Sequence, residues 1–305
     1  MMFFMIINCI VLLTMPFIML GIIKKTKAFW AGRKGVCLLQ PFYDFARLMK
    51  KESVYSNTTS FIFKITPIIS FAAVFVASFF VPMIGGFCID IPFGFIFFAY
   101  ILGLAKFFSI LSAMDTGSSF EGMGASREAC FTTLVEPAFF IMLASICAVA
   151  GSFSFSSLNT LLVSKDMLGI CIVVLAVVAL LIMLLIECSR VPVDDPNTHL
   201  ELTMIHEVMI LDNSGRELAL LTYVAGMKMV LISSLICTLL IPFALPLWLN
   251  AILYLSVLGL IAVLVGTVES GIARFRMSHI FEFVFSMTAF ALVILALVTI
   301  KVYGG

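Results

Sequence analysis

Ionisable side chains interrupt the most apolar stretches of this sequence, and they have the clearest potential for chemistry. Lys106, Glu136 and Lys228 each lie within a long apolar run, and Glu187 closes another. A charged side chain near the centre of a membrane helix costs roughly 2.5–3.5 kcal/mol on insertion scales, so such residues usually mark ion pathways or proton relays. We expect these four residues to form a proton or ion pathway that ends about halfway across the membrane, at Lys228. Charged residues nearer the ends of apolar runs are expected to reach water instead, and these are Lys64, Glu269 and Glu282.

The densest group of polar residues lies in the connection over residues 187–217. Glu187 and Arg190 are three residues apart on the last turn of a helix and can pair. Histidine titrates near neutral pH, so acid, imidazole and acid in succession suit a proton relay. The relay candidates are Asp194, Asp195, His199, Glu201, His206 and Glu207. Thr198 and Glu201 also match a helix capping box, which is a structural alternative for Glu201.

Cysteine and histidine usage argues against a metal centre or a cofactor in this chain. The eight cysteines are scattered singly, without a C-x-x-C pair, and the three histidines form no HExxH pattern. Iron–sulfur clusters and structural zinc need clustered ligands. The net charge of +1 gives no electrostatic footprint for nucleic acid.

The elements that must position these residues are membrane helices. The chain of 305 residues is 63% hydrophobic and 11% charged, with a mean hydropathy of +1.21, whereas soluble domains carry about 25% charged residues. Apolar runs of 18 or more residues indicate membrane spans. The sequence predicts an all-α integral membrane protein, one domain over 1–305, with spans at about 2–23, 61–82, 93–113, 131–151, 168–187, 218–243, 246–269 and 280–301.

Basic residues favour one side of this bundle. Thirteen Lys and Arg residues fall in the connections on one side, whereas the other side has only Lys165 and Lys301. Cytoplasmic connections carry the excess of basic residues. We therefore expect an inner-membrane protein with both termini outside and with its long polar connections in the cytoplasm.

The segment PFYDFARLMKKE (41–52) has the pattern of an amphipathic helix lying in the membrane interface. Pro41 suits the first helical position. Apolar residues fall at helical spacing on one side, and basic residues fall elsewhere. Anchoring to anionic lipid and docking of a partner subunit are equally compatible with this pattern.

Three stretches resemble subunit one of respiratory complex I, and they resemble more closely the membrane subunits of NiFe hydrogenases, of the formate hydrogenlyase and hydrogenase-4 component C type. The stretches are GRKGVCLLQPFYDFARLMKKE (32–52), MDTGSSFEGMGASREACFTTLVEP (114–137) and ECSRVPVDDPNTHLEL (187–202). Their order and spacing agree with the family over essentially the whole chain.

The resemblance implies a non-catalytic membrane anchor in an oxidoreductase complex. Hydrogenase-like large and small subunits and iron–sulfur proteins would dock on its cytoplasmic face, and antiporter-like subunits would lie beside it in the bilayer. Iron–sulfur clusters and possibly a NiFe site would belong to those partners. Glu136 and Glu187 fall on the family's membrane-boundary glutamates. The docking and cavity loops would contain Arg33, Gln40, Pro41, Asp44, Asp115, Arg127, Glu128 and Arg190.

The acidic loop departs from the complex I pattern. Asn197 and His199 replace two of its glutamates, and Asp195 with Pro196 adds an acid–proline pair. These departures argue against a complex I-like quinone cavity but leave the docking role intact. A quinone-reactive subunit and an autonomous ion transporter stay as alternatives. We expect substitution of Asp194, His199 or Glu201 to impair coupled turnover more than assembly.

Overall fold

A computed structural model describes residues 2–84, 86, 89, 91–150, 155, 167–195, 204–242 and 245–303. Within these ranges the chain forms helices and no strands. In chain order the helices are α1 (Met2–Trp30), α2 (Gln40–Met49), α3 (Phe61–Ala77), α4 (Gly94–Asp115), α5 (Ser119–Ala150), α7 (Met167–Glu187), α8 (His206–Met209), α9 (Gly215–Leu240), α10 (Leu247–Gly271) and α11 (Met277–Tyr303).

Seven of the described helices are long and apolar enough to cross a membrane. The helix α3 coincides with the second predicted span but is shorter, and its 17 residues rise roughly 26 Å. This arrangement confirms the expected all-α membrane architecture. The helix α5 begins at Ser119, well before the apolar run that predicted it, because its polar first turns continue as helix beyond the apolar part.

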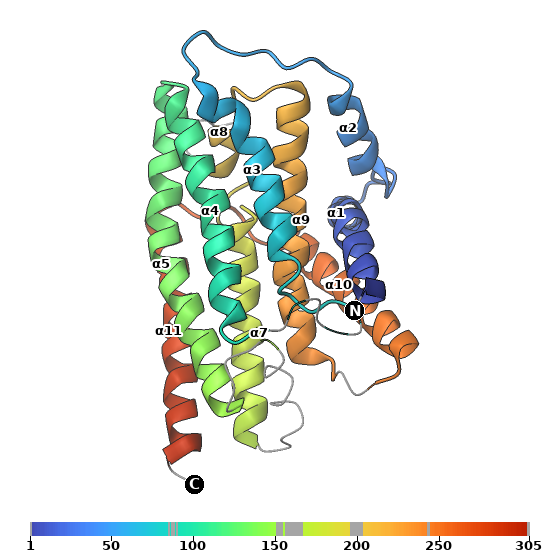
Figure 1. Ribbon diagram of the computed structural model, residues 1–305, viewed down its shortest axis with the longest axis vertical. Coiled ribbons are helices and arrows are strands. Elements are labelled where there is room, and N and C mark those ends of the chain that lie inside the picture. Colours follow the sequence, from blue (N-terminus) through green and yellow to red (C-terminus); the bar gives the residue numbers. More distant parts are fainter. Residues whose placement is uncertain are drawn as a thin grey trace.

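The helix α9 lies at the centre of the bundle (Figure 1). It contacts α1, α2, α3, α7 and α10, and most of its residues are buried. The helices α4, α5, α7 and α11 lie to one side of it, with α7 in contact, whereas α1 and α10 pair on the other side. Lys228, in the middle of α9, is therefore enclosed by protein rather than by lipid.

The amphipathic helix α2 lies at one end of the molecule, beside α1 and α9 (Figure 1). Pro41 occupies its first turn and is buried. The ring of Phe45 packs 5.1 Å from that of Tyr223 on α9 and 5.5 Å from that of Phe17 on α1. Arg47 is exposed on the same helix. The apolar face of α2 thus closes the space between α1 and α9.

Candidate functional site

A buried cluster of ion pairs joins the helices α4, α5 and α7. The Lys106 ammonium on α4 lies 2.5 Å from a carboxylate oxygen of Glu187, the last residue of α7. It also lies 3.5 Å from Glu128 on α5 and 3.0 Å from the Thr132 hydroxyl. The three charged side chains are about nine-tenths buried. Two carboxylates therefore share one lysine away from bulk water.

Lys228 and Glu136 extend this cluster on either side. Lys228 is 8% exposed and lines a small cavity with Glu187 and His206. Its ammonium interacts electrostatically with Glu187 and Glu128. Glu136 lines a second small cavity, of about 20 Å³, with Lys106 and Glu187, and a space of this size holds one water. The structure thus brings together all four residues that the sequence singled out inside apolar runs.

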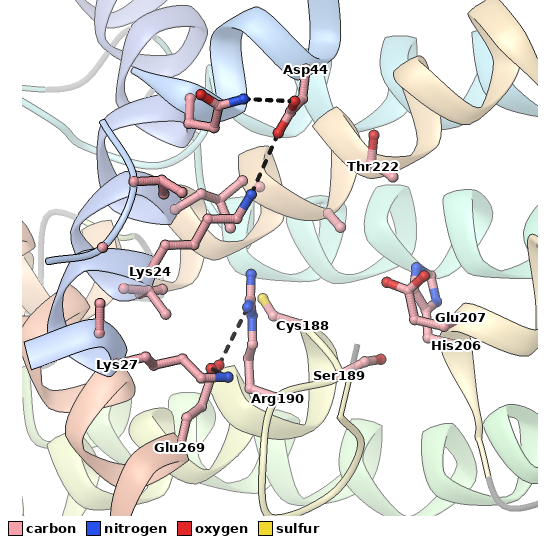
Figure 2. A pocket seen from close by; sticks show the side chains of 18 of the residues that line it. Lys24, Lys27, Asp44, Cys188, Ser189, Arg190, His206, Glu207, Thr222 and Glu269 are labelled. Atoms are coloured by element: carbon pink, nitrogen blue, oxygen red, sulfur yellow. Dashed lines mark hydrogen bonds and ion pairs between the residues drawn. The ribbon is translucent and has the colours of Figure 1, made fainter. Parts of the chain in front are cut away.

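A much larger cavity of about 890 Å³ lies between α1, α2, α9, α10 and the segment after α7. Figure 2 shows its charged and polar side chains from all of these elements, together with those of α8. Burial raises the pKa of the Cys188 thiol in its wall to about 12, so this cysteine stays a neutral packing residue. The ionisable groups that line the cavity are Lys24, Lys27, Asp44, Arg190, His206, Glu207 and Glu269.

Two ion pairs at Glu269 hold the wall of this main cavity. The Glu269 side chain is 1% exposed; it lies 2.8 Å from the ammonium of Lys27 and 3.3 Å from the guanidinium of Arg190. The expectation that Glu269 reaches water is therefore wrong. Arg190 also does not pair with Glu187, because α7 ends at Glu187 and the following turn carries Arg190 away from that helical face.

His206 connects the main cavity to the buried cluster. Its side chain lines both the main cavity and the small cavity that holds Lys228 and Glu187. The short helix α8 that carries it packs on α5 at Gly124, where a Cβ would collide with Val208. Close packing at this glycine fixes the imidazole between the two spaces.

Asp194 organises the chain around α8 rather than lining the main cavity. It is fully buried, and one of its oxygens accepts hydrogen bonds from the backbone N–H groups of Ile205 and His206, at 3.0 and 3.1 Å. The other oxygen lies 3.3 Å from the guanidinium of Arg274. Asp194 thereby acts as a positioning residue for His206.

The predicted docking residues divide between surface and interior. Arg33 is exposed, and Asp44 lies at the cavity rim, where it accepts a hydrogen bond from Gln40. Glu128 was expected on a docking loop, but it is buried beside Lys106 because α5 carries it inward. Backbone groups hold Asp115 and Arg127 in place: Asp115 accepts from the Ser60 N–H at 2.7 Å, and Arg127 donates to the Met204 carbonyl at 2.9 Å.

Two relay candidates, His199 and Glu201, lie outside the described residues. Asp195 is partly exposed, and Glu207 lines the main cavity. Among the residues that the structure describes, no group of three or more His, Cys, Asp and Glu side chains is placed to hold a metal ion.

The buried contacts of Asp194 change the expectation drawn from the sequence, that its substitution would impair turnover more than assembly. Replacement of Asp194 by Asn should destabilise the protein by about 3–5 kcal/mol, since it removes a buried charge that faces Arg274 and two backbone donors. Thermal unfolding of the purified complex measures this loss. The matched control is Asp212→Asn at an exposed position, which should change stability little. An Asp194→Asn complex as stable as the control would show that the carboxylate does not hold α8.

The fold and the site together define a multi-pass α-helical membrane protein with ionisable groups buried between its helices, beside a polar cavity. Residues 2–300 match the NADH dehydrogenase family, and the chain belongs to that family. It is 31% identical to Hydrogenase-4 component C of Escherichia coli (strain K12) over 299 aligned residues. This alignment covers 93% of this chain and 92% of that protein. The resemblance drawn from the three sequence stretches is confirmed.

Two further comparisons agree. Formate hydrogenlyase subunit 4 of Escherichia coli (strain K12) is 25% identical over 282 residues, which cover 89% of this chain and 90% of that protein. A chain in the structure of the membrane-bound sulfane sulfur reductase, an archaeal respiratory membrane complex, superposes with a TM-score of 0.80 at 17% identity. This match covers 97% of this chain and 99% of the other, and it establishes a shared fold.

Proposed function

We propose that this chain is the membrane-anchor and ion-pathway subunit of a complex I-like, hydrogenase-type oxidoreductase. The observation that carries the proposal is a series of ionisable groups that line adjoining cavities from the main cavity to the bundle centre. His206 lies between the cavity and Glu187, and Glu187 lies between Lys106 and the space beside Lys228. Such a series is what proton transfer between a docked redox domain and the membrane requires.

The names of the relatives support a place in a multi-subunit complex. Full-length likeness to a hydrogenase component and to a formate hydrogenlyase subunit favours iron–sulfur and hydrogenase-like partners on the side of α2 and α8. The basic connections lie at this end, so we assign it to the cytoplasm of an inner membrane, with both termini outside. Antiporter-like membrane subunits would then receive the ions.

The pathway in this chain ends at Lys228. In the far half of the bundle the buried polar side chains that the structure describes are uncharged, and these are Asn8, Ser78, Ser145, Ser233, Ser234, Thr238 and Asn250. Several of their hydroxyls are already hydrogen-bonded, as between Ser234 and Tyr254 at 2.6 Å. An ion there would meet no fixed charge, so we propose a half-channel that passes protons sideways to a neighbouring subunit.

The main cavity supports a second candidate function, the binding of an amphipathic redox molecule such as a quinone. Its volume of about 890 Å³ lies in the range of small-molecule sites, and its lining mixes charged groups with Leu20, Ile23 and Ile210. The two functions are compatible, because a reduced molecule bound there would lie next to His206.

Purification of the complex from native membranes in mild detergent tests the proposed assembly. We expect soluble iron–sulfur and hydrogenase-like subunits, together with antiporter-like subunits, to co-purify with this chain. Mass spectrometry of the purified material identifies them. Recovery of the chain alone, active as a transporter in liposomes, would contradict the proposal.

A further inference from the structure

A second hollow, of about 510 Å³, lies at the same end of the protein as the main cavity and shares none of its lining residues. It is formed by the first turns of α3 and α9 and by the chain that follows α2. Gly215, at φ +53°, brings the start of α9 against the Glu52 carbonyl, which fixes that chain segment over the hollow. The lining residues are Met49, Glu52, Ser53, Tyr55, Lys64, Pro67, Ile68, Arg216, Glu217 and Leu220.

A carboxylate that lines this hollow has one buried oxygen without a hydrogen-bond partner among the described residues. Glu217 is 6% exposed, and one of its oxygens accepts from the Tyr55 hydroxyl. The other oxygen has no hydrogen-bond partner in the part of the chain that the structure describes. The hydrogen bond to Glu217 also raises the pKa of Tyr55, which keeps the phenol a donor. Buried acceptors are normally hydrogen-bonded, and a ligand with a hydrogen-bond donor would satisfy this one.

Cations lie beside this carboxylate. The Lys64 ammonium lies 4.7 Å from the centre of the Tyr55 ring, and Arg216 precedes Glu217 on α9. Glu52 adds a second carboxylate to the lining. The hollow therefore offers positive groups for an anion and negative groups for a cation within one space.

The hollow opens where a membrane surface would lie. It sits at the ends of two apolar helices, and Phe61 and Ile68 on α3 are 71% and 60% exposed. Met49, Pro67, Ile68 and Leu220 give it an apolar wall continuous with that helix surface. Basic pockets between membrane helices at this level suit phospholipid headgroups.

We propose that this hollow binds the zwitterionic headgroup of a phospholipid with a primary amine, phosphatidylethanolamine. Its phosphate pairs with Lys64 and Arg216, its ammonium donates to the Glu217 carboxylate, and its first acyl carbons lie along Ile68 and Leu220. Phosphatidylcholine presents the same charges but has no N–H to donate, and phosphatidylglycerol lacks the cation. The site does not depend on the ion pathway proposed above.

Photo-crosslinking of the assembled complex tests this site. The complex is reconstituted in phosphatidylcholine vesicles that carry a trace of a photoreactive analogue of phosphatidylethanolamine, phosphatidylcholine or phosphatidylglycerol. Peptide mapping then measures labelling of residues 49–68 and 215–220. We expect the phosphatidylethanolamine analogue to label these peptides about tenfold more than either other analogue, as expected for one charge-assisted hydrogen bond. Soluble phosphoethanolamine at the same concentration should not compete.

A matched pair of variants localises the preference to Glu217. Glu217→Gln keeps an acceptor for Tyr55 but replaces the carboxylate, and it should bring the ratio of phosphatidylethanolamine to phosphatidylcholine labelling to about one. Glu121→Gln alters a buried carboxylate outside the hollow, which also has an unpartnered oxygen, and it should keep the tenfold ratio.

Several results would overturn the proposal. Equal labelling by all three lipids in the unaltered complex, or a ratio unchanged in Glu217→Gln, would remove the role of the carboxylate. Labelling by phosphatidylglycerol as strong as that by phosphatidylethanolamine would assign selection to the cations alone. Competition by soluble phosphoethanolamine would identify a site for a soluble headgroup rather than a lipid. If Glu217→Gln fails to assemble, the lipid ratios of the unaltered complex decide.

Discussion

Lys106→Met should abolish coupled activity and lower the stability of the chain by about 3–5 kcal/mol. Its ammonium is the partner of both Glu187 and Glu128, and removal of one member of a buried ion pair leaves an uncompensated charge. Thermal unfolding of the purified complex measures the loss of stability, and the amount of assembled complex in membranes provides a second readout. Lys25→Met, at an exposed position one residue from Lys24, is the control and should be neutral.

A double substitution separates the charge effect from simple loss of packing. Lys106→Met with Glu187→Gln removes both charges of the 2.5 Å pair, so it should recover stability relative to Lys106→Met alone. Ion movement should stay abolished in the double variant, because neither group can carry a proton. A double variant less stable than the sum of the single variants would contradict the ion-pair account.

Lys228→Met should uncouple ion movement from redox turnover without preventing assembly. Lys228 is buried at the centre of α9, and among the ion pairs found in the described residues it has none within 4.0 Å. Its replacement therefore orphans no carboxylate, in contrast to replacement of Lys106. We expect ions moved per turnover to fall at least about tenfold while electron transfer continues. Simultaneous measurement of substrate oxidation and ion uptake by proteoliposomes gives the ratio.

The charge-conserving variant Lys228→Arg is the matched control for this prediction. It keeps a cation at the same depth, so it should retain part of the coupling, although guanidinium is far less easily deprotonated than an ammonium. Full coupling in Lys228→Met would show that the pathway bypasses this residue. Loss of electron transfer in both variants would instead indicate a role in the fold.

The membrane helices were predictable from the sequence because the length of an apolar run is enough to identify a membrane span. The runs around Lys106, Glu136 and Lys228 also predicted buried charge, since insertion cost depends on position along a helix. The pairing of those charges was not predictable, because Lys106 and Glu187 lie 81 residues apart. They come together because α5 packs against both α4 and α7.

The errors in the sequence analysis have physical causes. Glu187 and Arg190 share a helical face only if the helix continues, and α7 ends between them. Glu269 lies near a helix end, which suggested contact with water, but α10 packs against α1 and brings it to Lys27. Lys27 and Glu269 carry opposite charges near the ends of two long apolar runs. This feature of the sequence could have suggested that the two residues pair.

The central claim is that ionisable groups lead from the main cavity past His206 to Lys228 and no further in this chain. A high-resolution map of the assembled complex, with ordered water resolved, tests it most directly. We predict waters between the main cavity, Glu187 and Lys228, and none beyond Lys228 in this subunit. A continuous file of water through this subunit alone, from one face of the membrane to the other, would contradict the claim.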